Sequence, residues 1–174
     1  MQRDQAKRDA KPAKPVHPIF VHFPVALLAS SVVADLFGFF TDNIALRNTA
    51  WWALLGAALG GVVTVVAGVY DMRRANIQEE VHERVHQHMK VGFVLVAAII
   101  GLTVWRWTFY AQAGVSITAA YLDVALLTAG LAGFQGWLGG ELVYTYGVFV
   151  KAVKPDSGMR GIAGAEDEKS SHHH

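Results

Sequence analysis

Charged residues are segregated along this chain so strongly that the pattern decides which solvent the folded protein faces. Four windows, 18–40, 49–70, 91–110 and 119–140, hold 87 of the 174 residues but only three of the 29 charges, which are Asp35, Arg106 and Asp123. A soluble domain places charges along every element to make a polar face. The segregation therefore predicts that lipid surrounds half of the chain. It argues against an ordinary soluble enzyme and against a disordered or fibrous chain.

Each apolar segment is long enough to cross a bilayer as a helix. The segments cover about 18–40, 49–70, 89–110 and 119–143. At about 1.5 Å per residue, each spans a hydrocarbon core of about 30 Å. Open strands cannot satisfy their backbone groups in lipid. The expected fold class is therefore all-α, a four-transmembrane-helix bundle.

Basic residues predict the orientation of this bundle and its tails. Of the 15 Lys and Arg residues, only Arg47 and Arg106 fall on the side away from both termini. Because positive charge favours the cytoplasm, both termini are expected to be cytoplasmic. The expected organisation is a charged tail over 1–16, a membrane domain over 17–150, a polar tail over 151–169 and a probable tag remnant over 170–174.

The composition excludes several kinds of chemistry. The chain has no cysteine, which removes thiolate catalysis, disulfides, cysteine-ligated iron–sulfur clusters and covalent haem attachment through a Cys-x-x-Cys-His motif. A net charge of +1 gives no reason to expect nucleic acid as a partner.

Small and polar residues in the apolar segments predict which faces point into the bundle, because such residues belong between helices rather than against lipid. The stripe through His86 and Lys90 has only apolar residues further along the segment, so His88 rather than His86 is expected to face inward. The predicted inward stripes are Gly56, Gly60, Thr64, Gly68 and Asp71 in segment two, His88, Gly92, Leu95, Ile99, Thr103 and Arg106 in segment three, and Asp123, Gly130, Gly133, Trp137, Glu141 and Tyr144 in segment four.

Histidines gather at the predicted cytoplasmic end of the bundle. Antiparallel bundles commonly hold cofactors between facing helices, and haem iron takes imidazole ligands. We expect a haem b with His22 and His88 as axial ligands, glycine stripes that leave room for the macrocycle, and Arg73 or Arg74 paired with its propionates. The alternative is that the histidines lie at headgroup level and that the glycines only allow close helix packing. The five histidines outside the tag remnant are His17, His22, His82, His86 and His88.

A second pattern of metal-ligating residues precedes the third segment. Glu79-x-x-His82 overlaps Glu83-x-x-His86, a spacing that places a carboxylate and an imidazole on one helix face in di-iron bundles. His82 and His86 are also four residues apart, which suits zinc. They form the alternative metal site. The competing interpretation is a solvated, charged helix start, because a di-iron site needs matching carboxylates on other helices.

Two carboxylates, Asp35 and Asp123, lie toward the outer side of the membrane segments. Asp35 is expected about one turn from the outer boundary, and an intramembrane carboxylate is by default a functional hypothesis. Its expected partner is Arg106. A structural ion pair is the alternative.

Three sequence motifs carry a resemblance to a known family. Over roughly residues 15–151, the chain resembles the bacterial membrane proteins grouped as domain of unknown function 2231. The motifs are His17-Pro-Ile-Phe-Val-His22-Phe-Pro-Val-Ala-Leu, Ala67-Gly-Val-Tyr-Asp71 and Gly136-Trp-Leu-Gly-Gly-Glu-Leu-Val-Tyr144-Thr-Tyr-Gly-Val-Phe-Val.

Members of that family are small four-helix membrane proteins, some of them joined to Rieske or cytochrome c modules. The resemblance therefore implies a multi-pass protein of the bacterial inner membrane with a role in or beside a redox chain. The family pattern points to His17, His22, Asp71, a histidine before segment three, Glu141 and Tyr144. The chain departs from those members in having no attached redox module, so it is expected either to pass electrons to a separate protein or to serve as a subunit of a larger complex.

The residues and the resemblance together predict a haem-b-binding, cytochrome-b-like electron-transfer protein or redox-complex subunit. It would be a carrier or subunit rather than a stand-alone enzyme, with Asp71, Glu141 and Tyr144 orienting ligands or managing nearby protons. The expected partners are the lipid bilayer and other membrane redox subunits or quinone, and a homo-oligomer stays open. The alternatives are a cofactor-free assembly subunit and a metal-binding membrane protein that uses His82 and His86.

Overall fold

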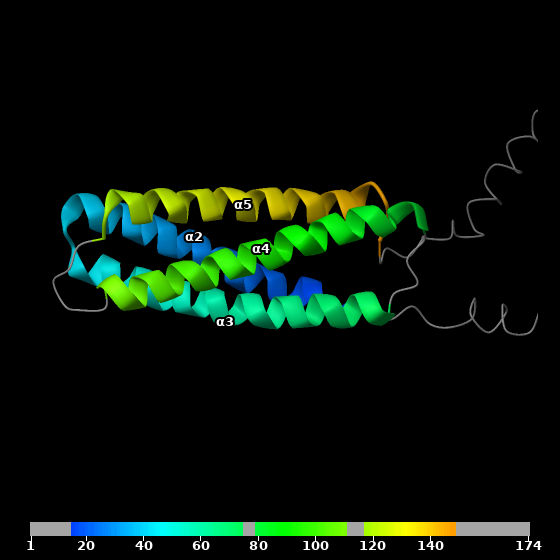
Figure 1. Ribbon diagram of the computed structural model, residues 1–174, viewed down its shortest axis with the longest axis horizontal. Coiled ribbons are helices and arrows are strands. Elements are labelled where there is room, and N and C mark those ends of the chain that lie inside the picture. Colours follow the sequence, from blue (N-terminus) through cyan, green and yellow to red (C-terminus); the bar gives the residue numbers. More distant parts are fainter. Residues whose placement is uncertain (1–14, 75–78, 111–116, 149–174) are drawn as a thin grey trace, which may run out of the picture.

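Four long helices make up the part of the chain that the structure describes. The computed structural model describes residues 15–74, 79–110 and 117–148. Within them α2 spans His17–Thr41, α3 spans Ile44–Arg74, α4 spans Glu79–Tyr110 and α5 spans Ala119–Tyr144. The helices alternate in direction, so α2 begins, α3 ends, α4 begins and α5 ends at the same end of the bundle (Figure 1). The predicted all-α bundle is confirmed. The expected tails over 1–16 and 151–169 and the tag remnant lie outside the described residues, apart from residues 15 and 16.

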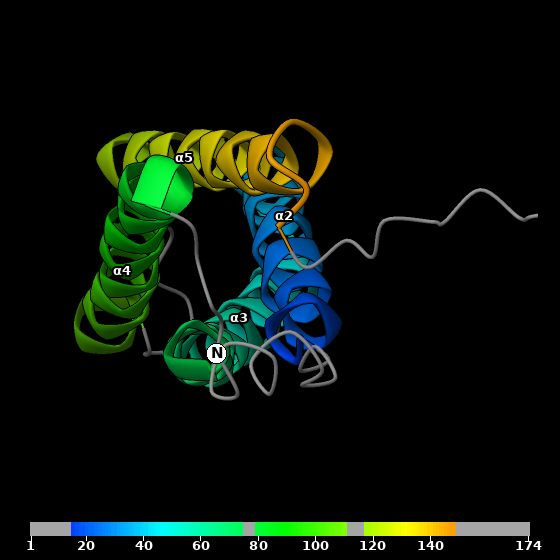
Figure 2. The same cartoon turned by 90° about the vertical axis from the view of Figure 1, so that its right-hand side faces the viewer.

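The helices stand at the corners of a square in chain order, so that α2 lies diagonally across from α4 and α3 from α5 (Figure 2). We call the end where α2 begins the histidine end, because it holds His17, His22, His82, His86 and His88. We call the other end, where α2 turns into α3, the turn end. A side chain that reaches across the diagonal can therefore meet one from the opposite helix.

Glycines let α3 pack closely against α2. A Cβ atom placed on Gly60 would lie 3.4 Å from Cδ of Pro24, and one on Gly56 would lie 3.0 Å from Cδ1 of Leu27. The space beside these two glycines is thus filled by α2 side chains, as in other membrane helix pairs with small residues at the interface. The expectation that this stripe leaves room for a macrocycle is wrong at these positions.

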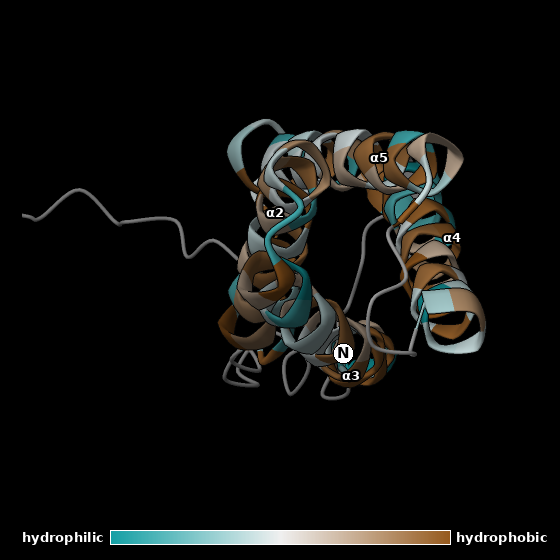
Figure 3. Cartoon of the chain, turned by 90° about the vertical axis from the view of Figure 1, so that its left-hand side faces the viewer, coloured by the Kyte–Doolittle hydropathy of each residue, from teal (hydrophilic) through white to brown (hydrophobic). Residues whose placement is uncertain are grey.

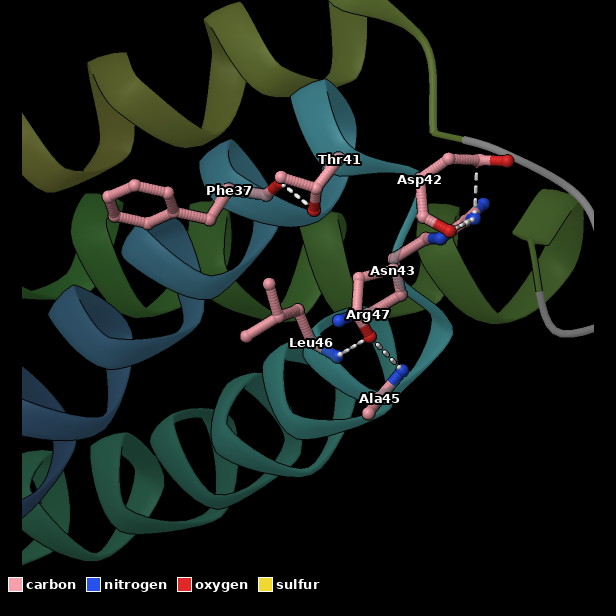
Figure 4. A network of polar contacts seen from close by, with 7 residues as sticks. All are labelled: Phe37, Thr41, Asp42, Asn43, Ala45, Leu46 and Arg47. Carbon is pink, nitrogen blue, oxygen red and sulfur yellow. Dashed lines mark hydrogen bonds and ion pairs between the residues drawn. The ribbon is translucent and has the colours of Figure 1, made fainter.

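The turn between α2 and α3 is held by short polar contacts (Figure 4). Asp42 adopts a left-handed conformation, with φ of 53°. The side-chain oxygen of Asn43 then accepts hydrogen bonds from the backbone N–H groups of Ala45 and Leu46, at 2.9 and 3.4 Å. This arrangement caps the first turn of α3, whose N–H groups have no partner within the helix. Arg47 closes the turn by donating to the carbonyl oxygen of Asp42 at 2.9 Å.

The outer surface of the bundle is apolar. Hydrophobic residues occur along all four helices (Figure 3), and large side chains such as Phe40, Leu127 and Trp52 are 76, 73 and 67 % exposed. Among the described residues, three helices are long and apolar enough to cross a membrane, namely His17–Thr41, Ile44–Arg74 and Val81–Tyr110. The protein thus has the surface of a multi-pass membrane protein. The fourth span, expected over 119–143, stays a prediction.

The predicted inward stripes hold for two segments and fail for the third. The stripe of segment two is shielded throughout, and the stripe of segment three is shielded from His88 to Arg106. On α5, in contrast, Gly130, Gly133 and Trp137 are exposed. That prediction is wrong because α5 packs through an apolar face instead. Its buried residues are Tyr121, Leu122, Ala125, Thr128, Ala132, Leu138 and Leu142.

A buried ion pair joins all four helices near the turn end. Arg106 of α4 forms a salt bridge with Asp35 of α2, and the two side chains are 5 and 1 % exposed. Arg106 also donates to the carbonyl oxygen of Arg47 in α3 at 2.7 Å and to the hydroxyl of Tyr121 in α5 at 3.4 Å. The predicted pairing of Asp35 with Arg106 is confirmed. One guanidinium therefore contacts each of the other three helices.

Candidate cofactor site

His17 occupies the first position of α2 and is held there by α3. One carboxylate oxygen of Asp71 accepts hydrogen bonds from the backbone N–H groups of Val16 and His17, both at 2.7 Å. Asp71 is 6 % exposed, so it caps α2 from a neighbouring helix at a shielded position. The sequence predicts that Asp71 orients ligands or manages nearby protons, and the structure places its carboxylate at the backbone that carries His17.

The imidazole of His17 has a fixed orientation. Its Nδ1 lies 2.9 Å from the carbonyl oxygen of Thr64. A carbonyl can only accept, so Nδ1 carries the proton and Nε2 keeps a lone pair. A Cβ on Gly68 would lie 3.1 Å from Nδ1, so the glycine lets the ring pack directly on α3. A backbone partner on one ring nitrogen and a lone pair on the other is the usual arrangement of metal-ligating histidines.

His88 is half-buried and lies against α5. The amide nitrogen of Gln135 donates to the backbone carbonyl of His88 at 3.0 Å and lies 3.3 Å from its Nε2. An amide nitrogen can only donate, so Nε2 of His88 accepts and its Nδ1 carries the proton. A Cβ on Gly139 would lie 3.1 Å from Cε1 of His88. The edge of the ring that bears both nitrogens thus faces α5.

The two histidines meet across the diagonal of the bundle. The ring centroids of His17 and His88 are 6.2 Å apart, with their planes at 87°. Two buried polar atoms on the His88 side, Nδ1 of His88 and Oε1 of Gln135, have no hydrogen-bond partner among the described residues. Unpaired buried polar atoms are uncommon in native structures. The site therefore combines two imidazole side chains, a type that can bind metals, with polar atoms that lack a partner among the described residues.

The capping role of Asp71 gives a stability prediction. Asp71→Ala removes the acceptor of two backbone N–H groups, and we expect it to lower the free energy of unfolding by about 1–2 kcal/mol. Asp71→Asn is the matched control, because its amide oxygen can still accept, and it should keep most of the stability. Unfolding in mixed detergent micelles, followed by tryptophan fluorescence, measures both. Equal losses in the two variants would contradict the capping role.

The structure brings His17, rather than His22, to His88. His22 is exposed. It follows His17 by five residues, which is about 140° around a helix with 3.6 residues per turn. The expectation that His22 faces His88 is therefore not met by the described geometry. Pro24, two residues later, is buried against Gly60 instead.

Four other predicted site residues lie near the ends of α3 and α5. Arg73 and Arg74 are exposed at the end of α3, and Arg74 donates to the hydroxyl of Tyr70 at 2.5 Å. Glu141 lies 4.0 Å from the guanidinium of Arg84 on α4. Tyr144 is 90 % exposed. No described contact links these four side chains to His17 or His88.

Sequence reasoning missed Gln135. It lies in the buried register of α5 that also contains Thr128 and Ala132, one turn before Gly139. A polar amide in an apolar segment is itself a signal, since polar groups in membrane helices face their neighbours. Gln135 was missed because the stripe with Gly130 and Gly133, on the other face of the helix, was predicted to face the bundle interior.

His82 and His86 lie together on another face of α4. Their ring centroids are 4.5 Å apart, with the planes at 51°. His82 is exposed and His86 is half-buried. Among the described residues, no group of three or more histidine, aspartate or glutamate side chains is arranged to hold a metal ion.

Comparison with known proteins places the chain in one family. The model of a family described as "Predicted membrane protein (DUF2231)" matches residues 13–152. No curated protein and no solved structure matches the chain. The matched range contains all four helices and both histidine pairs.

Proposed function

The chain belongs to this family of predicted membrane proteins, and we propose that it is a haem-b-binding electron-transfer protein of the membrane. His17 and His88 are the proposed axial ligands, in place of the pair His22 and His88. The observation that carries the proposal is the meeting of these two imidazoles across the bundle diagonal, with ring centroids 6.2 Å apart.

The separation of the rings supports this assignment. Metal–imidazole bonds of about 2 Å put the centroids of two imidazoles on opposite sides of one metal roughly 6 Å apart. Bundle proteins commonly build cofactor sites from side chains on facing helices. The centroid distance between His17 and His88 is of this size with both rings in their present orientations.

The hydrogen bonds fit the two ligands unequally. His17 is ready to ligate, because its Nδ1–H is fixed by the carbonyl of Thr64 and its Nε2 is free. His88 would ligate after its ring turns away from Gln135, which exchanges a contact of 3.3 Å for a metal bond. The Nδ1 of His88 has no partner to lose in this turn, and Gln135 can keep its hydrogen bond to the backbone carbonyl of His88.

The remaining residues of the site hold the ligands in place. Asp71 keeps the first turn of α2 in position through two hydrogen bonds, and Gln135 holds the backbone of His88. Arg73 and Arg74 are exposed at the same end, where they could meet anionic groups such as propionates. A bound haem b would supply reversible one-electron chemistry, whose potential depends on the axial ligands and the surrounding polarity.

Basic residues suggest the side on which this site works. Arg73, Arg74, Arg84 and Lys90 all belong to the histidine end, and positive charge favours the cytoplasm. We propose the inner membrane of a bacterium as the location, with the histidine end facing the cytoplasm. Quinone or another membrane redox subunit is then a better electron partner than a soluble cytochrome c on the outside.

An oxidised-minus-reduced visible spectrum of the detergent-solubilised protein tests the proposal. The protein is expressed with haem in excess, and haem is quantified per chain. We expect a b-type spectrum at close to one haem per chain. A blank spectrum would overturn the electron-transfer proposal and favour a cofactor-free subunit of a larger membrane complex.

A further inference from the structure

A second pair of imidazoles stands apart from the proposed haem site. His82 and His86 lie one turn apart on the first part of α4, and their ring centroids are 4.5 Å apart. His88 follows His86 by two residues, which is about 200° around the helix. The two pairs therefore use opposite faces of α4. The face with His82 and His86 is accessible, since His82 is exposed and His86 half-buried.

The spacing of this pair matches two neighbouring ligands of one metal ion. Bonds of about 2 Å with an angle between 90° and the tetrahedral value bring two imidazole centroids roughly 4–5 Å apart. Histidines at i and i+4 on a helix are a common way to supply such a pair. The two rings thus already have the separation that one shared ion requires.

We propose that His82 and His86 form a surface site for a divalent transition-metal ion, with Cu²⁺ bound more tightly than Ni²⁺ or Zn²⁺. Imidazole suits all three ions, and their order of affinity at nitrogen ligands favours copper. Two protein ligands leave the other positions of the ion open to water. Glu83, exposed three residues before His86, is the nearest carboxylate in sequence that could replace one of these waters.

The charges around the site modulate its affinity. Lys90 is exposed one turn after His86 on the same helix face, so it repels a cation bound there. Arg84 points to the other side of α4, where its guanidinium lies 4.0 Å from Glu141. Lys90→Ala should therefore tighten metal binding, whereas Arg84→Ala should change it less.

A metal titration tests this site without reference to haem. The protein is truncated after residue 169, to remove His172, His173 and His174, and is purified without immobilised nickel. Cu²⁺ and Zn²⁺ are then titrated against a chromophoric chelator. We expect one equivalent of bound Cu²⁺ per chain, absent from His82→Ala, His86→Ala and the double variant. His22→Ala, which removes an exposed histidine on α2, is the matched control and should keep it.

A spectroscopic readout separates ligation from an indirect effect. The electron paramagnetic resonance spectrum of the Cu²⁺ protein should show two imidazole nitrogens, and each single variant should lose this signature while its circular dichroism stays unchanged. Binding that persists in the double variant would overturn the proposal, as would failure to bind Cu²⁺ at all. The double variant should still bind haem. A failure of the copper proposal therefore leaves the haem proposal intact, and a failure of the haem proposal leaves the copper proposal intact.

Discussion

Arg106→Leu is expected to lower the free energy of unfolding by about 3–5 kcal/mol, the usual effect of removing one partner of a buried ion pair. The loss comes mainly from Asp35. Its side chain is 1 % exposed, and its Oδ1 already lacks a hydrogen-bond partner. Without the guanidinium, a carboxylate would be left in an apolar interior with nothing to compensate its charge. The contacts to α3 and α5 are lost in the same step.

Two further variants separate this explanation from a general effect of losing an arginine. Arg84→Leu removes a half-exposed arginine whose nearest carboxylate is 4.0 Å away, and it should change the stability by less than about 1 kcal/mol. The double variant Asp35→Leu with Arg106→Leu removes both charges, and it should recover much of the loss. Unfolding by sodium dodecyl sulfate in mixed micelles measures all three. A double variant less stable than Arg106→Leu alone would show that the uncompensated charge is not the cause.

The buried ion pair also shows what the sequence could predict. Only three charges fall in the apolar windows, so Asp35 had few partners available, and Arg106 was the basic one. A charge inside a membrane segment must find a partner, and this requirement fixes a long-range contact from composition alone. The same logic predicted the shielded stripes of α3 and α4, because small and polar residues there form a single register.

The prediction of the buried face on α5 was wrong, because two faces of that helix are both suited to packing. On α5, one face carries glycines together with Trp137 and Tyr144, and the other carries alanines, leucines and Gln135. Both faces can pack in a membrane, where apolar side chains gain little by leaving lipid for protein. Hydrophobicity therefore does not choose between them. The fit of each face against the side chains of α4 and α2 decides which face is buried. That fit cannot be predicted from the sequence of α5 alone.

The structure brings His17 rather than His22 to His88 for a related reason. The first segment is expected to start at about residue 18, and α2 starts at His17, where Asp71 caps it from α3. When another helix supplies the capping side chain, the residues next to the capped position contain no capping motif that would predict the start of the helix. His17 was thus among the candidate residues, but the position of its backbone depends on a contact 54 residues away in the chain.

His17→Ala and His88→Ala should each abolish the b-type spectrum that we expect of the wild-type protein, because a bis-imidazole haem without one axial ligand is bound weakly. His22→Ala should keep the spectrum, since His22 is exposed on another face of α2. His86→Ala should also keep the spectrum, because His86 lies on the face of α4 opposite His88. Haem content per chain is measured in detergent, with circular dichroism to show that each variant is folded.

Substitution by another haem-ligating residue distinguishes a histidine that binds the iron from one that only packs between helices. Methionine ligates haem iron and raises the reduction potential, so His17→Met and His88→Met should restore a haem spectrum with a higher midpoint potential. A histidine that only packs between helices would give variants whose potential equals that of the wild type. If His22→Ala, rather than His17→Ala, removed the spectrum, the haem would be held by the face of α2 that the structure places outside. The assignment of His17 as ligand would then fail, although the bundle itself would stand.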